Sequence, residues 1–408
     1  MDISRDLQAL PLTLCQIATV EDGANAIAIA QLDFAPADGL RLTNLSHDFY
    51  FHPIDIEQSF ITSLGQHVRL YRDKAIDPGR LPQGYHATWR FDYGLHSDNS
   101  WPEGPLQFNK WALPCDELLR YLRESAMTTG WPNGVFTIEL KDAAIMEFEV
   151  PAWDAYLRWM KASTWNVQLY DETSITPRSH FMIEYAAPVE LGTIRLHEGS
   201  LRVFVNWVWQ MWLHAPQLSL WNAERHTMLY RADPPQVFSN THALVFKKEL
   251  VKTRFGQWLN AWLAIGAREM RAIRQVIDVY ANTALSIDLK YVMTHEALVT
   301  LAKDPENSDS DEALARHWMK GEQINRLRAL KRLERLRFTR NEILHIDRHP
   351  QFKEGDILEG IERTRALYQM DAVFRAFVLK LLGEPEQAID EYVRGAFMSI
   401  DSMALRYY

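Results

Sequence analysis

Residues 340–345 read Arg-Asn-Glu-Ile-Leu-His, and three of these side chains are suited to chemistry on a phosphate. The planar guanidinium of Arg340 can bind two phosphate oxygens at once. The imidazole of His345 has an ordinary pKa near neutral pH, so it can take up or release a proton under physiological conditions. Asn341 adds an amide that both donates and accepts hydrogen bonds. This motif is therefore a candidate catalytic site.

The positions of these residues on their predicted helix are unusual for polar side chains. A helix turns by about 100° per residue, and a count from Ile324 places Arg340, Asn341 and His345 on the apolar side. That side is formed by Leu327, Ala329, Leu330, Leu333 and Leu336. Burying an unpaired polar group costs about 1–3 kcal/mol. The three side chains should therefore either form a local network or line a cleft that a ligand enters.

Four basic residues fall on the opposite face of this helix in the same count, and we call them the basic stripe: Arg328, Lys331, Arg332 and Arg335. Runs of charge on a helix are usually solvated faces. A basic stripe can also bind the phosphates of RNA. Both interpretations stay open, and in either case the stripe points away from the motif.

The motif and its surroundings resemble the HEPN superfamily, in which an Arg is followed a few residues later by a His within a helical bundle. An Asn directly after the Arg, as at Asn341, is common in the nuclease members. The layout resembles the ApeA-type antiphage defence proteins, which join a β-rich N-terminal domain to a C-terminal HEPN bundle. The first helix of that bundle carries a pair like Phe255 and Trp258, and Glu296 matches a glutamate on the second helix. The resemblance in sequence covers residues 246–408. For residues 1–245 it rests on architecture alone.

This resemblance implies a metal-independent endoribonuclease without a cofactor, acting as an antiphage effector or toxin. His345 would transfer the proton of the ribose 2′-OH, and Arg340 would stabilise the charge that builds on the phosphorane. Asn341 would orient one of them or contact the phosphate, and Glu296 would support the site. The products would carry a 2′,3′-cyclic phosphate. The resemblance also implies a homodimer through the bundle, tRNA as the favoured RNA, and a phage-derived trigger at the N-terminal domain.

Other interpretations of the same residues remain open. Arg340 could form an ion pair with Glu296 that only stabilises the bundle, and His345 could cap the end of its helix. The chain would then be a non-catalytic HEPN module for dimerisation and nucleotide or partner binding, or a sensor whose bundle is a scaffold. A zinc site at His345, Asp347 and His349 is not expected, because Pro350 ends the helix there.

The pattern of apolar, polar and turn residues along the sequence predicts an α+β protein with two domains. Residues 246–408 show long helical periodicity and should form an all-α HEPN four-helix bundle. Its helices are predicted at 248–283, 285–303, 313–345 and 353–383, with a short one after Pro385. The acidic interval Asp304–Glu312 has no apolar residue and should be a loop.

Residues 1–245 should form a β-rich sensing or regulatory domain, because short aromatic and β-branched segments alternate there with turn residues. Helices are expected at 115–126 and 199–214, and the stretch from Pro234 to Thr241 is the predicted boundary. Examples of the predicted strands are Ile27–Phe34, His67–Arg72, Tyr85–Tyr93, Val135–Leu140, Ile145–Val150, Trp165–Tyr170 and Phe181–Tyr185.

The charge of the chain is uneven along its length. Residues 1–250 hold 20 Lys and Arg against 30 Asp and Glu, which leaves 24 and 23 for the rest of the 408 residues and a total of −9. Neither part is basic in bulk, so any nucleic-acid site must be local. The sequence lacks a secretion signal and any run of about 18 apolar residues. We therefore expect a cytoplasmic protein without a membrane contact.

Overall fold

The structure of the protein is a computed structural model. It describes residues 13–21, 24–35, 39–44, 57–62, 66–71, 88–98, 100–101, 105–118, 127–130, 137–140, 143–167, 173–210, 213–223, 225–233, 246–303, 310–344 and 357–404. The chain divides into two compact units. The first comprises Met1–Gly199 and Leu213–Pro235, and the second comprises Ser200–Trp212 and Gln236–Tyr408. Residues 200–212, placed in the N-terminal domain by the sequence, thus group with the helices.

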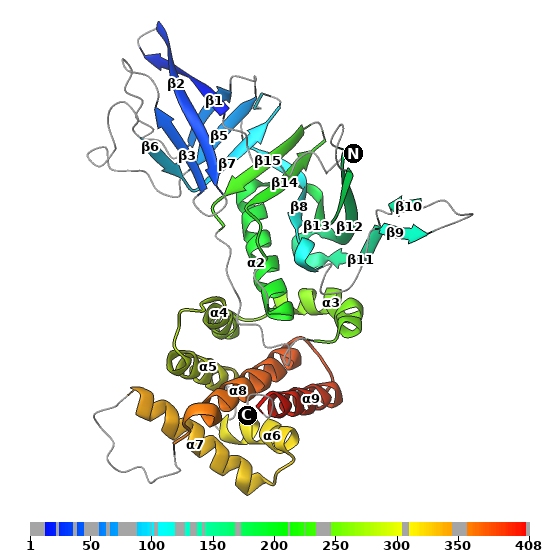
Figure 1. Ribbon diagram of the computed structural model, residues 1–408, viewed down its shortest axis with the longest axis vertical. Coiled ribbons are helices and arrows are strands. Elements are labelled where there is room, and N and C mark those ends of the chain that lie inside the picture. Colours follow the sequence, from blue (N-terminus) through cyan, green and yellow to red (C-terminus); the bar gives the residue numbers. More distant parts are fainter. Residues whose placement is uncertain are drawn as a thin grey trace. The chain divides into compact units, whose positions relative to one another are not determined.

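The first unit is built on one large sheet, in which the described strand pairs are antiparallel (Figure 1). The strand order is β11-β12-β13-β8-β14-β15-β7-β5-β4-β1-β2-β3-β6. A separate hairpin pairs β9 (Met127–Gly130) with β10 (Thr137–Leu140). The strands of the large sheet are β1 (Thr13–Glu21), β2 (Ala24–Ala35), β3 (Gly39–Asn44), β4 (Glu57–Thr62), β5 (His67–Tyr71), β6 (Thr88–Phe91), β7 (Tyr93–Ser97), β8 (Gln107–Pro114), β11 (Ala143–Val150), β12 (Ala155–Val167), β13 (Thr173–Glu190), β14 (Gln217–Asn222) and β15 (Arg225–Arg231).

Alternation of apolar and polar residues directs one face of these strands into the core. In β5, Val68 and Leu70 are buried and the residues between them are partly exposed, as the two-residue period of a strand requires. The sheet also bends so that β3 approaches β7. A side chain added at Gly94 would come within 2.5 Å of the Leu40 side chain, so the missing side chain of Gly94 permits this contact.

The β-rich character predicted for this unit is confirmed. Predicted strands coincide with parts of β2, β5, β10, β11, β12 and β13. The segment Tyr85–Tyr93 is wrong as a single strand, because β6 ends at Phe91 and β7 begins at Tyr93, and residues 85–87 lie outside the described residues. Residues 168–170 of another predicted strand also lie outside them. Strands β14 and β15 are not among the predicted examples, and they lie inside the sheet between β8 and β7.

Two helices were predicted in the N-terminal part. Helix α2 (Leu191–Trp209) corresponds to the one expected at 199–214, but it begins and ends earlier. Of the helix expected at 115–126, residues 116–118 are helical and residues 119–126 lie outside the described part. The three-residue helix η4 (Pro151–Trp153) joins β11 to β12.

The second unit is helical after residue 246 (Figure 1). Its centre is α8, which is buried on almost every side between Ala366 and Leu379 and packs against α5 and α9. A helix that is apolar all round belongs inside a core. The helices are α3 (Lys248–Leu263), α4 (Ala267–Ala281), α5 (Ile287–Ala302), α6 (Ser310–Glu322), α7 (Arg326–Leu344), α8 (Gly360–Leu381) and α9 (Glu386–Ala404).

The helical character of this unit is confirmed, but the predicted number of helices is wrong. The helix expected at 248–283 is broken before α4, where Gly266 has an extended backbone with φ −63° and ψ 156°. The helix expected at 313–345 is broken at Gln323, whose φ of +53° lies in the left-handed region. The helix after Pro385 is the long α9 instead of a short one. The described part therefore holds seven helices after residue 246, and the four-helix arrangement is not confirmed.

The remaining predicted boundaries shift by a few residues. Helix α8 begins at Gly360 instead of 353, and residues 353–356 lie outside the described part. Of the predicted acidic loop, residues 310–312 form the first turn of α6, whereas 304–309 are not described. None of the described helices combines the length and apolar content needed to cross a membrane.

The aromatic pair that contributed to the resemblance lies in the core of this unit. Phe255 packs against Phe204 with ring centroids 5.0 Å apart. The indole nitrogen of Trp258 donates a hydrogen bond of 2.8 Å to the buried Glu384. Both side chains are fully buried, so their role in the structure is packing.

Candidate functional site

Helices α5, α6 and α7 enclose a cavity of about 310 Å³, which we call the Arg340 cavity. Its apolar wall comes from leucines and a valine of all three helices. Its polar wall carries two cations, two carboxylates, an imidazole, an amide and a hydroxyl. The lining residues that the argument uses are His295, Glu296, Asp311, Arg337, Arg340 and Asn341.

Arg340 lies at the centre of a short hydrogen-bond network in this cavity. Its Nε and Nη2 atoms donate to Oε1 of Glu296 at 2.8 and 2.7 Å. Its Nη1 atom donates to Oδ1 of Asn341 at 2.8 Å. The side chains of Arg340 and Glu296 keep 27% and 46% of their surface exposed, so the pair is open to solvent on one side. The structure thus joins three residues that the sequence singled out.

Hydrogen bonds at the helix ends fix the two helices that carry this network. The hydroxyl of Ser286 accepts from the backbone N–H of Leu289 and caps α5. On α7, the Thr339 hydroxyl donates to the carbonyl of Arg335 and accepts from the N–H of Leu358. Thr339 therefore ties the turn that holds Arg340 to the segment before α8.

A buried tyrosine connects α5 directly to α7. The hydroxyl of Tyr291 donates to the backbone carbonyl of Leu336 at 3.2 Å. Burial raises the pKa of Tyr291 well above its ordinary value, so this hydroxyl stays protonated and remains a donor. The bond fixes the register between the helix that carries Glu296 and the helix that carries Arg340.

His295 also lines the cavity, and the sequence reasoning did not single it out. Its side chain is 14% exposed, and its Nδ1 atom lies 3.7 Å from Oε1 of Glu296. Burial lowers the pKa of His295, while the charge of Glu296 opposes that shift. The imidazole is therefore neutral at pH 7 and can accept a proton. Its one sequence signal is its place directly before Glu296 on the same helix.

The third residue of the motif, His345, lies outside the described residues, as do Asp347 and His349 of the zinc alternative. The last described residue of α7 is Leu344. The structure therefore shows Arg340, Asn341 and Glu296 together. The placement of His345 stays a prediction from the sequence.

The basic stripe differs from its predicted position on the outer face. Arg332 and Arg335 are partly buried against α8, where Arg332 donates to Gln369 at 3.2 Å and Arg335 to Glu362 at 3.0 Å. Arg328 and Lys331 are exposed as expected. Leu327, predicted to be buried, is 75% exposed because it lies in the first turn of α7.

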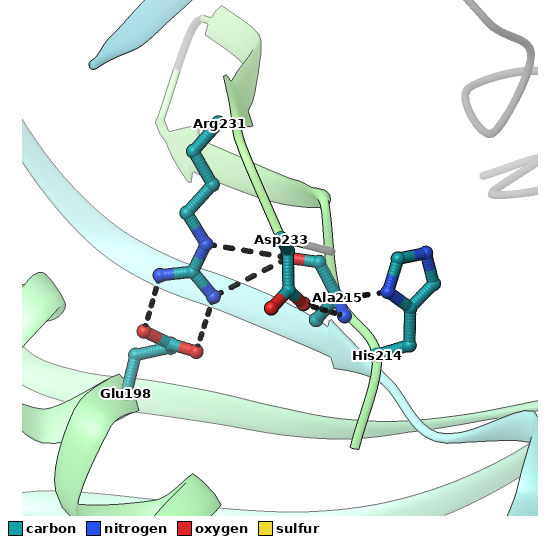
Figure 2. Close-up of polar contacts among 5 residues, drawn as sticks. All are labelled: Glu198, His214, Ala215, Arg231 and Asp233. Atoms are coloured by element: carbon teal, nitrogen blue, oxygen red, sulfur yellow. Dashed lines mark hydrogen bonds and ion pairs between the residues drawn. The ribbon is translucent and has the colours of Figure 1, made fainter. Parts of the chain in front are cut away.

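A separate polar cluster lies in the first unit (Figure 2). Arg231 of β15 donates to both carboxylate oxygens of Glu198 on α2, at 2.7 and 2.6 Å, and Glu198 is 2% exposed. Asp233 accepts from the N–H of Ala215 and lies 3.7 Å from Nδ1 of His214. A buried carboxylate needs such a partner to remain charged. This cluster joins the strand to the helix within the first unit.

Within the described ranges, no group of three or more His, Cys, Asp or Glu side chains could hold a metal ion. Comparisons with protein-family models, with curated proteins and with solved structures find no match to this chain. The assignment of a function therefore depends on the chemistry of the site itself.

Proposed function

We propose that the helical unit is a metal-independent endoribonuclease whose site is built on Arg340, Asn341 and His345. The observation that supports this proposal is the network of Arg340, Asn341 and Glu296 at a cavity. Polar residues gathered at a solvent-accessible cavity fit a ligand site better than a dry core. The resemblance of the motif to HEPN nucleases points to the same chemistry.

The hydrogen-bond capacity of Arg340 leaves room for a phosphate. A guanidinium has five N–H donors, and the bonds to Glu296 and Asn341 use one each on Nε, Nη1 and Nη2. One donor on each terminal nitrogen is left for a phosphate oxygen. The neighbouring side chains hold the plane of the guanidinium before a ligand arrives, which is the arrangement expected for electrostatic stabilisation of a transition state.

The proposed reaction is an internal transesterification of RNA. The ribose 2′-oxygen attacks the adjacent phosphorus as its proton passes to a base. The bond from phosphorus to the 5′-oxygen then breaks, and that oxygen takes up a proton. His345 would carry the proton, Arg340 would stabilise the phosphorane, and Asn341 would orient Arg340. The products are a 2′,3′-cyclic phosphate and a 5′-hydroxyl, and DNA should resist because it lacks the 2′-OH.

The biological setting follows the same proposal. The chain would act as an antiphage effector or toxin, with tRNA as the favoured substrate. Two copies would pair through the helical unit, and the β-rich unit would respond to a phage-derived trigger.

The alternative function is a non-catalytic HEPN module for dimerisation and nucleotide or partner binding. One observation favours it: Glu296 already engages two nitrogens of Arg340, as a purely structural ion pair would. Both functions include a dimer, so only RNA cleavage separates them.

The test uses the full chain, total cellular RNA and purified tRNA in the presence of EDTA. The wild type should cut RNA and leave 2′,3′-cyclic ends, and Arg340→Ala should lower the rate about 10²–10³-fold. His345→Ala should be similarly impaired. Arg326→Ala is the matched control, because Arg326 forms an exposed ion pair with Glu312 at the other end of α7. If RNA stays intact both with the purified wild type and in phage-infected cells that express it, the non-catalytic function is favoured.

A further inference from the structure

A second pocket of about 310 Å³ lies between the end of α6, α7 and the first turns of α8, and we call it the basic pocket. It shares no lining residue with the Arg340 cavity. Its lining consists of Glu322, Ile324, Arg328, Lys331, Arg332, Arg335, Glu362 and Arg365. All four residues of the basic stripe are among them, and Arg365 from α8 adds a fifth cation.

The charge of this lining is strongly positive. Five cations face two carboxylates, a local excess of three positive charges in a chain whose net charge is −9. Arg335 pairs with Glu362 at 3.0 Å. Arg365 pairs with Asp401 outside the pocket at 2.7 Å. Arg328 and Lys331 have no ion pair among the described residues. An anion is the ligand class that this imbalance favours.

A buried amide behind the pocket bonds to two of its lining residues. Gln369 of α8 is fully buried and accepts from Arg332 at 3.2 Å, while its own Nε2 atom donates to Glu322 at 3.0 Å. The side chain of Arg332 is only 13% exposed. This geometry fixes a guanidinium before any ligand binds, which reduces the entropy lost on binding.

Three of the arginines that line the pocket have a buried nitrogen donor without an acceptor. The Nε atoms of Arg332, Arg335 and Arg365 are buried and make no hydrogen bond in the described part of the chain. The nearest carboxylate oxygen to Nε of Arg332 lies 3.8 Å away on Glu322, beyond hydrogen-bond distance. Buried donors without a partner are destabilising. Because these Nε atoms are closed to solvent, a ligand in the pocket would first contact the exposed side chains of Arg328 and Lys331.

We propose that the basic pocket binds a phosphate group. Clustered arginines present the flat forks that match phosphate oxygens. The lining includes no aromatic side chain on which a base could stack, so recognition would be of phosphate and not of a nucleobase. The phosphate could belong to an RNA backbone or to free phosphate or pyrophosphate. This inference does not rest on nuclease activity, because the two sites share no residue.

The experiment measures binding to the full chain in the Arg340→Ala background, so that RNA stays intact. The probes are inorganic phosphate, pyrophosphate and a single-stranded oligouridine, titrated by calorimetry. The test variant is Arg328→Glu combined with Lys331→Glu, and both side chains are exposed. The matched control is Arg271→Glu, an exposed arginine of α4 away from the pocket. Thermal unfolding should be alike in all three proteins.

The parent and the Arg271→Glu control should bind at least one probe, and the double variant should bind it at least tenfold more weakly. With RNA, loss of two phosphate contacts should reduce the slope of log affinity against log salt by about 1.4. Binding of RNA alone would identify a backbone phosphate, and binding of pyrophosphate would identify a free one. Equal weakening by Arg271→Glu, or no binding of any probe by the parent, would overturn the proposal.

Discussion

Glu296 offers the sharpest test of what the Arg340 network does. Its carboxylate touches no proposed substrate atom, so in a nuclease it would be a positioning residue for Arg340. Glu296→Gln keeps an oxygen that can accept from Nε and Nη2 of Arg340. Glu296→Ala removes every acceptor. Comparing the two variants therefore separates the effect of holding the guanidinium in position from the effect of the negative charge beside it.

The ion pair itself should contribute little to folding. At the 2.7 Å between Nη2 and Oε1, Coulomb's law gives about 1.5 kcal/mol in water. Glu296 is 46% exposed, so the medium is close to water, and ordering two long side chains offsets part of this gain. We expect a net contribution of at most about 1 kcal/mol, which corresponds to a fall of about 2–4 °C in Tm.

The effect on catalysis should be larger than the effect on folding. Glu296→Ala should lower kcat about tenfold or more, because small displacements of a catalytic group are costly. Glu296→Gln should keep kcat close to that of the wild type. The assay pairs cleavage rates on one RNA with thermal unfolding of the same samples. Equal kcat values for the two variants would contradict a positioning role, and a Tm loss far above 4 °C would favour a structural ion pair.

Two further predictions concern other buried groups. Arg231→Ala should destabilise the first unit by about 3–5 kcal/mol, because it removes the guanidinium that pairs with the buried carboxylate of Glu198. An unchanged denaturant midpoint would refute this. Burial lowers the pKa of His317 from 6.5 to about 4, so the unfolded chain binds more protons and stability should fall as pH drops from 6.5 toward 4. The free energy of unfolding, measured with denaturant, should differ less between pH 4.5 and pH 7 for His317→Gln than for the wild type. An equal difference in the two proteins would show that His317 does not cause the pH dependence.

The sequence predicted the change from strands to helices because the spacing of apolar residues reflects which side chains of an element are buried, and turn residues mark where elements end. It did not predict the breaks inside two of the helices. The residues before Gly266 read as helix formers, and a single glycine inside a helical pattern is often tolerated, so the sequence did not reveal the turn there. At Gln323 the backbone is left-handed, with a φ of +53°, whereas the residue type gives no sign of it.

The candidate site was predicted in part, for a physical reason that the structure explains. Arg340 and Asn341 interrupted an apolar pattern, and they form a network at a cavity. Their partner Glu296 lies on another helix, and periodicity cannot pair residues across helices; only the family resemblance pointed to it. The same limit applies to His295, and to Arg365 in the basic pocket. A straight helical count also failed at Leu327, since the first turn of a helix can extend past its neighbours.

The central position of α8 constrains how the chain can fold during synthesis. Arg375 of α8 donates to the carbonyl of Trp207 at 2.9 Å, so the core of the helical unit joins residues separated by 168 positions. A ribosome makes the α2 segment well before it makes α8. Until α8 has left the exit tunnel, α5 lacks the helix that it packs against. The core of the helical unit can therefore close only after α8 has been translated, although every residue that lines the Arg340 cavity precedes that helix.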